Sequence, residues 1–278
     1  SYGPTNAEQL DLYPTTKSNA PINVYIHGGA WRAGSAAREA YQAEMFVDAG
    51  AHFIAVDFNN AIETKGDVMV MAEEVRRAVA WVHRNAASFG GDPNRLYVSG
   101  HSSGAHLTAV VLTTDWTTTF GLPQDIVKGG LGASGMYELM PVSLSVRRQY
   151  VTFTPLVIEA LSPIRHLESL TAPVIVAHGS LETPEFQRQS REFAAAVKAA
   201  GKAVDSIVLS GYNHFERYMN QPVTYRFNRG VPNLITMLAY PSTFHVDVDH
   251  DMGLYAQDRW TMNRLTLDVG VRYDYYVT

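Results

Sequence analysis

Apolar runs rich in β-branched residues alternate with longer amphipathic segments from the N-terminus to about residue 215. The clearest helix is predicted over residues 67–86, where Asp67 can cap the first turn. A second helix is predicted over residues 184–200, between Thr183 as cap and Gly201 as stop. Strands that alternate with helices predict an α/β fold with a mostly parallel sheet and helices on both faces. The short apolar runs predict strands at 10–13, 23–26, 53–56, 95–99, 128–133, 173–177 and 204–209.

This alternation stops near residue 221. Residues 261–275 instead alternate apolar and polar side chains, which is typical of a long antiparallel strand. Residues 243–257 carry a weaker version of the same pattern. We therefore predict two parts, an α/β domain over residues 1–220 and a β-rich C-terminal extension over residues 221–278.

Residues 135–170 interrupt the pattern inside the first part. They are rich in Pro, Met, Tyr and Phe and contain Arg147 and Arg148. We expect this segment to leave the sheet as a partial lid, and a plain surface connection is the alternative.

Composition excludes several classes of protein. The 278 residues carry a net charge of −5 without a Lys/Arg cluster, which argues against a nucleic-acid partner. The absence of Cys removes disulfides, thiolate nucleophiles and thiolate metal sites. No apolar run is long enough for a membrane-spanning helix and no signal peptide is visible, so a cytoplasmic location is the expectation.

The strand at residues 95–99 runs into Gly-His-Ser-Ser-Gly and then into a segment of helical character over residues 102–112. A Gly-x-Ser-x-Gly sequence between a strand and a helix is the pattern of a nucleophile elbow. Such a turn exposes the serine hydroxyl at the top of a sheet. Ser102 is therefore the candidate nucleophile, and an ordinary strand-to-helix turn that happens to carry Ser is the alternative.

A serine nucleophile needs a base, and the base needs an acid that orients it. On a sheet of this type the chain order is Ser, acid, His, each at the carboxyl end of a strand. His214 follows the strand at 204–209, and Glu182 follows the strand at 173–177. Glu185 remains an alternative acid, although the first turn of a helix already accounts for a carboxylate there.

The strand at residues 23–26 leads into His27-Gly-Gly-Ala-Trp31. Its backbone N–H groups can approach a substrate oxygen closely, because the side chains there are absent or small. Together with the N–H of Ser103 they would form an oxyanion hole. A tight glycine turn without this role is the alternative.

These three motifs together resemble the α/β-hydrolase superfamily over about residues 10–218. Within it, the chain is similar to arylformamidases and to the carboxylesterases of the hormone-sensitive-lipase group. The resemblance implies Gly29, Ala30 and Ser103 as oxyanion donors. It also implies a reaction that needs no metal and no cofactor. Two features depart from the family: the acid is Glu where many relatives have Asp, and the helix that usually closes the fold after the catalytic His is not recognisable.

Aromatic residues near the predicted site raise the question of substrate shape. Trp31 and Tyr137 are expected to form part of a wall that accepts an aryl group, and simple membership of the core is the alternative. Such a wall would suit aromatic esters.

Residues 222–278 resemble barrel strands of TonB-dependent outer-membrane receptors. A few strands cannot close a barrel, so we do not expect a membrane protein. A fused fragment, folded as an arm on the hydrolase or on a second subunit, is the expectation, and a homodimer is a further one.

The expected function is that of a serine hydrolase that cleaves small carboxylic esters through an acyl-enzyme. Arylformamidase activity on N-formylkynurenine is the close alternative, since it uses the same machinery. A hydrolase-fold binding protein without activity and an outer-membrane transport component are remoter alternatives.

Overall fold

The computed structural model of the chain describes residues 1–215, 223–228, 231–237, 250–262 and 265–277. These residues fall into two compact units, Ser1–Thr236 and Met237–Thr278. The predicted boundary between residues 220 and 221 lies outside the described residues and stays a prediction.

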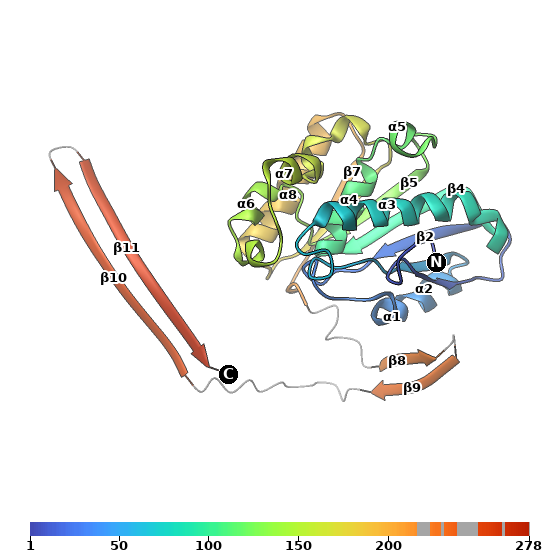
Figure 1. Cartoon of the computed structure of the whole chain (residues 1–278), viewed down its shortest axis with the longest axis horizontal. Helices are drawn as coiled ribbons and strands as arrows, with labels where there is room; N and C mark the ends of the chain where they lie inside the picture. Colours follow the sequence, from blue (N-terminus) through green and yellow to red (C-terminus); the bar gives the residue numbers. More distant parts are fainter. Residues whose placement is uncertain (216–222, 229–230, 238–249, 263–264, 278) are drawn as a thin grey trace. The chain divides into compact units, whose positions relative to one another are not determined.

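Seven strands form one sheet in the order β1-β3-β2-β4-β5-β6-β7 (Figure 1). β1 pairs antiparallel with β3, and every other neighbouring pair is parallel. The sheet therefore confirms the predicted mostly parallel α/β architecture. Its strands are β1 (Leu10–Tyr13), β2 (Ala20–Ile26), β3 (His52–Val56), β4 (Gly91–His101), β5 (Val127–Ala133), β6 (Val174–Gly179) and β7 (Val204–Leu209).

The two long helices predicted from periodicity are present. Asp67 caps the first of them by accepting a 2.9 Å hydrogen bond from the N–H of Met69. Thr183 precedes the second, but its side chain makes no capping bond, and Pro184 at the first position starts that helix. The helices are α1 (Ala36–Glu39), α2 (Ala43–Asp48), α3 (Val68–Asn85), α4 (Ser103–Leu112), α5 (Trp116–Phe120), α6 (Leu139–Ser143), α7 (Pro155–Ala160) and α8 (Pro184–Ala199), with short 3-10 turns η1 (Ala40–Gln42), η2 (Ala86–Phe89), η3 (Val146–Gln149), η4 (Pro163–Arg165) and η5 (Leu167–Ser169).

Side chains that alternate along the central strands separate the two faces of the sheet. On β3, Ile54 and Val56 face the large core under α3 and α4. Phe53 and Ala55 face a smaller cluster with Phe46 of α2. One face is thus covered along its length, whereas the cover on the second face is short.

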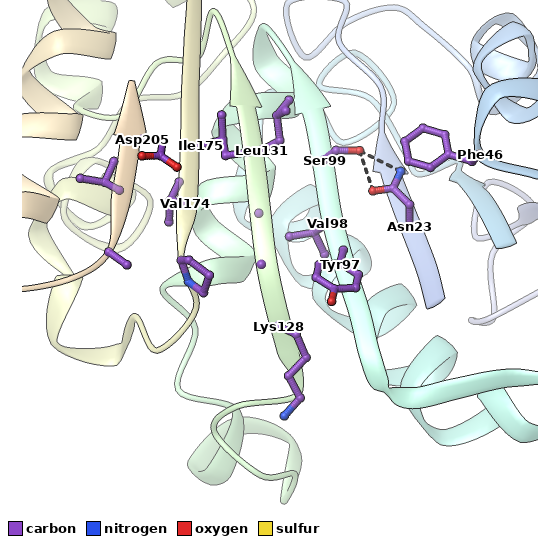
Figure 2. A pocket seen from close by; sticks show the side chains of 15 residues that line it. Asn23, Phe46, Tyr97, Val98, Ser99, Lys128, Leu131, Val174, Ile175 and Asp205 are labelled. Carbon is purple, nitrogen blue, oxygen red and sulfur yellow. Dashed lines mark hydrogen bonds between the residues drawn. The ribbon is translucent and has the colours of Figure 1, made fainter. Parts of the chain in front are cut away.

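The second face is open to solvent over strands β4 to β7. Tyr97 is 40% exposed, Leu131 36% and Ile207 43%, although strands of a parallel sheet are normally buried on both faces. Figure 2 shows the hollow there, about 590 Å³ in volume, and the hydrogen-bonded pair Asn23 and Ser99 at its border.

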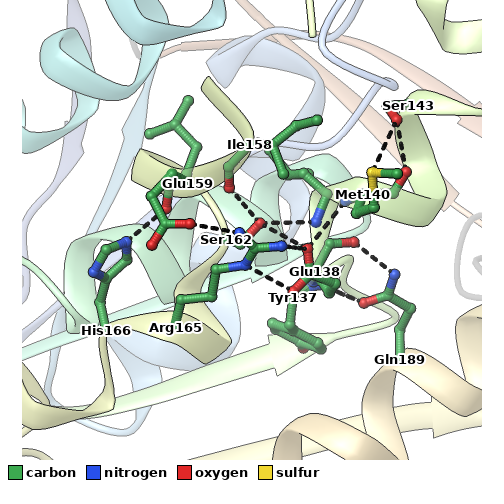
Figure 3. A network of polar contacts seen from close by, with 12 residues as sticks. Tyr137, Glu138, Met140, Ser143, Ile158, Glu159, Ser162, Arg165, His166 and Gln189 are labelled. Atoms are coloured by element: carbon green, nitrogen blue, oxygen red, sulfur yellow. Dashed lines mark hydrogen bonds and ion pairs between the residues drawn. The ribbon is translucent and has the colours of Figure 1, made fainter. Parts of the chain in front are cut away.

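The segment over residues 135–170 leaves the sheet and is built from short helices. Figure 3 shows the polar network that holds it, with the Arg165 guanidinium on both carboxylate oxygens of Glu138 at 2.7 and 2.9 Å. Gln189 of α8 joins the network by accepting from the N–H of Tyr137 and of Glu138, at 2.9 Å each. The segment is thus anchored to α8, and its role as a lid stays a prediction.

The C-terminal part is β-rich, as the alternating pattern predicts. Its elements are β8 (Val223–Asn228), β9 (Val231–Met237), β10 (His250–Met262) and β11 (Leu265–Val277). β10 and β11 pair antiparallel, from Met262 opposite Leu265 to His250 opposite Val277.

Candidate active site

Ser102 occupies the sharp turn between β4 and α4. Its backbone has φ 58° and ψ −124°, a left-handed conformation that residues with a side chain rarely adopt. Only glycine fits on either side of the turn. A Cβ at Gly100 would lie 2.5 Å from the carbonyl oxygen of Gly104, and one at Gly104 would lie 2.1 Å from that of Ile26. The turn therefore has the geometry of a nucleophile elbow.

Ser102, His214 and Glu182 form one hydrogen-bonded line. Nε2 of His214 lies 2.9 Å from Oγ of Ser102, and Nδ1 of His214 lies 3.1 Å from Oε2 of Glu182. The three residues follow β4, β7 and β6, whose carboxyl ends meet at one edge of the sheet. Because Nδ1–H donates to the carboxylate, the lone pair of Nε2 faces the serine hydroxyl and can accept its proton.

The structure places Glu182, and not Glu185, against the imidazole. Glu185 lies on α8 and is half exposed, with Arg188 at 2.7 Å and Gln189 at 3.1 Å from its Oε1. It is thus occupied by contacts of its own helix. Of the two acids that the sequence left open, only Glu182 contacts His214.

Glu182 is buried and firmly held. Its Oε1 accepts from the N–H of Gly179 at 2.8 Å and from the hydroxyl of Ser134 at 2.5 Å. Burial raises the pKa of the Glu182 carboxyl, but the hydrogen bonds from His214, Ser134 and Gly179 outweigh it and leave the pKa below its ordinary value. The group is therefore a carboxylate at neutral pH, as an orienting acid must be.

The glycine-rich loop after β2 lies directly against the elbow. A Cβ at Gly28 would lie 2.7 Å from the carbonyl oxygen of His101, so only glycine permits this approach. The hydroxyl of Ser103 accepts a 3.1 Å bond from the N–H of Trp31 and ties the loop to α4.

The predicted oxyanion donors lie in this loop and at the start of α4. The backbone N–H groups of Gly29, Ala30 and Ser103 donate no hydrogen bond to any residue that the structure describes. Gly29 and Ala30 also line the same pocket as Ser102. These N–H groups are available for an oxygen that develops negative charge.

The pocket above Ser102 has a volume of about 550 Å³. The motifs predicted the part made by the glycine loop, the elbow and His214. The remaining wall was not predicted, and it comes from four separate segments. That wall consists of Arg32, Ala33, Gly34, Arg38, Glu39, Arg147, Thr183, Phe186 and Phe215.

Trp31 and Tyr137, the predicted aryl wall, lie in the core and do not line this pocket. Trp31 is 3% exposed, and its Nε1–H donates to Nδ1 of His106 at 3.2 Å. Tyr137 is 1% exposed and stacks on Phe193 with ring centroids 4.1 Å apart. The alternative reading of both residues as core fits this placement, and Phe186 and Phe215 are the aromatic residues that face the pocket.

Two further observations concern metal ions and membranes. Among the residues that the structure describes, no three His, Asp or Glu side chains gather as a metal site requires. None of the helices in the described part of the chain combines the length and apolarity needed to span a bilayer.

Known proteins are similar to this chain in sequence and in fold. The kynurenine formamidase of Danio rerio is 35% identical over 221 residues, which cover 77% of this chain and 73% of that protein. The chain belongs to the α/β-hydrolase family of the kynurenine formamidases and related esterases. The family described as BD-FAE also matches, over residues 10–128.

Esterases within this family are similar in sequence and structure. Esterase LipQ of Mycobacterium tuberculosis is 30% identical over 229 residues, covering 74% of this chain and 53% of that protein. The solved structure of Thermogutta terrifontis esterase 2 phosphorylated by paraoxon has a TM-score of 0.63 at 25% identity, covering 77% of this chain and 82% of that one. These likenesses confirm the predicted α/β-hydrolase fold and its esterase relatives.

A second family, described as TonB dependent receptor-like, beta-barrel, matches residues 74–278. Over residues 74–209, however, the structure has helices and parallel strands, whereas barrel strands of this type are antiparallel. The antiparallel pair β10–β11 belongs to the C-terminal part, where the sequence itself resembles such strands.

Proposed function

We propose that the chain is a serine hydrolase that cleaves carboxylic esters of modest size. The line from Ser102 Oγ through the His214 imidazole to the Glu182 carboxylate carries this proposal, because it opens into a pocket beside unused N–H donors. The esterases among the relatives support ester substrates.

Acylation begins when Oγ of Ser102 attacks the ester carbonyl while Nε2 of His214 takes the hydroxyl proton. The N–H groups of Gly29, Ala30 and Ser103 hold the oxyanion of the tetrahedral intermediate. Glu182 keeps the imidazole in the required tautomer and stabilises the imidazolium. His214 then gives its proton to the leaving alcohol, and the acyl group stays on Ser102.

Deacylation repeats the same steps with water as nucleophile. His214 removes a proton from the water, which attacks the acyl carbonyl, and the tetrahedral intermediate collapses with return of a proton to Oγ of Ser102. The carboxylic acid leaves, and no other group is consumed.

Arylformamidase activity is the second candidate, favoured by the 35% identity to the kynurenine formamidase of Danio rerio. The same groups would cleave a formamide. The pocket decides between the two activities, because both reactions use the same triad and oxyanion donors.

A paired assay tests both activities. Release of nitrophenol from p-nitrophenyl butyrate and cleavage of N-formylkynurenine are measured with the unchanged protein and with Ser102→Ala. The substitution should lower kcat by a factor on the order of 10⁴ or more. Substantial turnover by Ser102→Ala would place the nucleophile elsewhere.

Labelling with paraoxon provides a readout independent of turnover. Thermogutta terrifontis esterase 2 has been solved phosphorylated by this reagent. We expect one diethylphosphoryl group on Ser102 of the unchanged protein, detected by mass spectrometry of its peptide, and none on Ser102→Ala.

A further inference from the structure

We propose that Arg147 makes this enzyme select esters that carry a carboxylate remote from the scissile bond. The inference rests on the proposed ester hydrolysis and adds a substrate class to it. It assigns a task to an arginine that the catalytic steps do not use.

The guanidinium of Arg147 has unused donors. It makes no hydrogen bond or ion pair with any residue that the structure describes, and its Nε is buried without an acceptor. The contact that it does make is with the Phe186 ring, whose centroid lies 6.0 Å from the guanidinium carbon. A buried donor left without a partner costs free energy, so an acceptor brought by a ligand would be bound favourably.

Two other arginines near this segment, Arg165 and Arg188, are paired with carboxylates. The guanidinium of Arg165 forms ion pairs with Glu138 and Glu159. Arg188 pairs with Glu185 and Glu192. Arg147 therefore differs from Arg165 and Arg188 in having donors left for a substrate.

Arg147 lines the same pocket as Ser102. The Phe186 ring contacts both groups, since its centroid lies 6.0 Å from the guanidinium carbon of Arg147 and 4.2 Å from the ring centroid of His214. A substrate bound to Ser102 that extends past this ring would reach the guanidinium with the end far from the reacting carbonyl.

The charge of the pocket wall favours an anion. Arg32, Arg38 and Arg147 line it against one carboxylate, that of Glu39, although the whole chain carries a net charge of −5. Oε2 of Glu39 accepts a 2.8 Å hydrogen bond from Gln42. The planar fork of a guanidinium matches the two oxygens of a carboxylate, and its charge persists at every assay pH.

The test compares esters that differ only in the remote group. For the acyl side, the pair is mono-p-nitrophenyl adipate and p-nitrophenyl hexanoate, which share chain length and leaving group. For the alcohol side, the pair is p-acetoxybenzoate and p-acetoxybenzamide. The quantity measured is the ratio of kcat/KM for the charged ester to that for its neutral partner, which cancels any general damage to the enzyme.

Arg147→Met keeps an apolar stem on Phe186 and removes the charge. We expect it to lower this ratio for at least one pair by about 10- to 100-fold, the range for a charge-assisted hydrogen bond. Arg147→Lys should restore part of the ratio. Arg148→Met is the matched control, since Arg148 is exposed, carries the same charge and does not line the pocket.

Unchanged ratios for both pairs in Arg147→Met would overturn the inference while leaving ester hydrolysis intact. A protein that cleaves none of the four esters would instead overturn the proposed function. Binding then still tests Arg147: calorimetry with the Ser102→Ala protein should show monomethyl adipate binding more tightly than methyl hexanoate. Loss of that preference in Ser102→Ala/Arg147→Met supports the inference, and its persistence, or no preference at all, overturns it.

Discussion

The hydroxyl of Ser134 donates a 2.5 Å hydrogen bond to Oε1 of Glu182, the carboxylate oxygen that His214 does not contact. Ser134 follows β5 and has φ 57°. The acid of the candidate triad is therefore fixed from a neighbouring strand end as well as from its own loop. One oxygen is used to hold the group in place and the other to orient the imidazole.

Removal of this contact should weaken catalysis and alter its pH dependence. Ser134→Gly removes the hydroxyl while permitting the positive φ, so it isolates the hydrogen bond. Since that bond lowers the pKa of Glu182, the variant should have a higher pKa there and a kcat/KM reduced by about 3- to 10-fold at neutral pH.

The loss of stability in the same variant should depend on pH in a defined direction. A carboxyl whose pKa is lowered by folding stabilises the protein above its unfolded pKa, and this stabilisation is lost as pH falls through the folded pKa. The difference in unfolding free energy between Ser134→Gly and the unchanged protein should shrink in that acid range. A difference that grows on acidification would contradict the assigned role of Ser134.

The backbone of Ser102 predicts an order of stability between two inactive variants. Ser102→Ala and Ser102→Gly both lose the hydroxyl, but only glycine adopts φ 58° without strain. Ser102→Gly should unfold with a free energy about 1 kcal/mol higher than that of Ser102→Ala. Urea denaturation followed by circular dichroism measures the difference, and equal stabilities would contradict this order.

Gly28→Ala should damage the site without requiring any unusual backbone angle. The added Cβ would lie 2.7 Å from the carbonyl oxygen of His101 and 3.3 Å from Cβ of Ser102. The glycine loop must then move away from the elbow, which misplaces the oxyanion donors. We expect kcat to fall by about 10² or more in a protein that still unfolds cooperatively. Unchanged kcat would show that the loop does not serve the reaction.

The burial of His106 predicts that the protein loses stability under mildly acidic conditions. It is fully buried, with Nδ1 accepting from Trp31 at 3.2 Å and Nε2 at 2.8 Å from the carbonyl oxygen of Leu161. Burial lowers its pKa from 6.5 to about 4. Since only the unfolded chain binds this proton between those pH values, stability falls as pH drops from 6.5 towards 4.

The size of this effect is measurable. His106 should contribute a loss of about 2 kcal/mol between pH 7 and pH 5. Denaturation of the unchanged protein and of His106→Gln at both pH values isolates that contribution, because His27 and His178, whose pKa values are also lowered by burial, are common to both proteins. Equal pH dependence in the two proteins would contradict the prediction.

The sequence predicted those parts of the structure that local rules determine. Periodicity located α3 and α8, and the Gly-x-Ser-x-Gly pattern located the elbow, because glycine is required there by contacts within a few residues. Chain order was sufficient to bring Ser102, Glu182 and His214 to one edge, since parallel strands end on the same side. The start of β4 was placed too late because Gly91 pairs with Ala20, a distant residue.

Other features depend on packing that no local pattern encodes. Trp31 is adjacent to the glycine loop in sequence, yet its ring turns into the core and bonds to His106. Ser134 belongs to no motif and contacts Glu182 from another strand. The arginines of the pocket come from two segments far apart in the sequence, so only the folded chain shows that they share a wall with Ser102.

The conformation of residue 102 also limits which nucleophile this scaffold can carry. A threonine branches at Cβ, and β-branched residues are strongly disfavoured at φ 58°. Cysteine is unbranched and fits the same backbone as serine. Evolution or engineering could therefore replace Ser102 by cysteine, but not by threonine. The backbone of the elbow sets this limit, and the chemistry of the base does not.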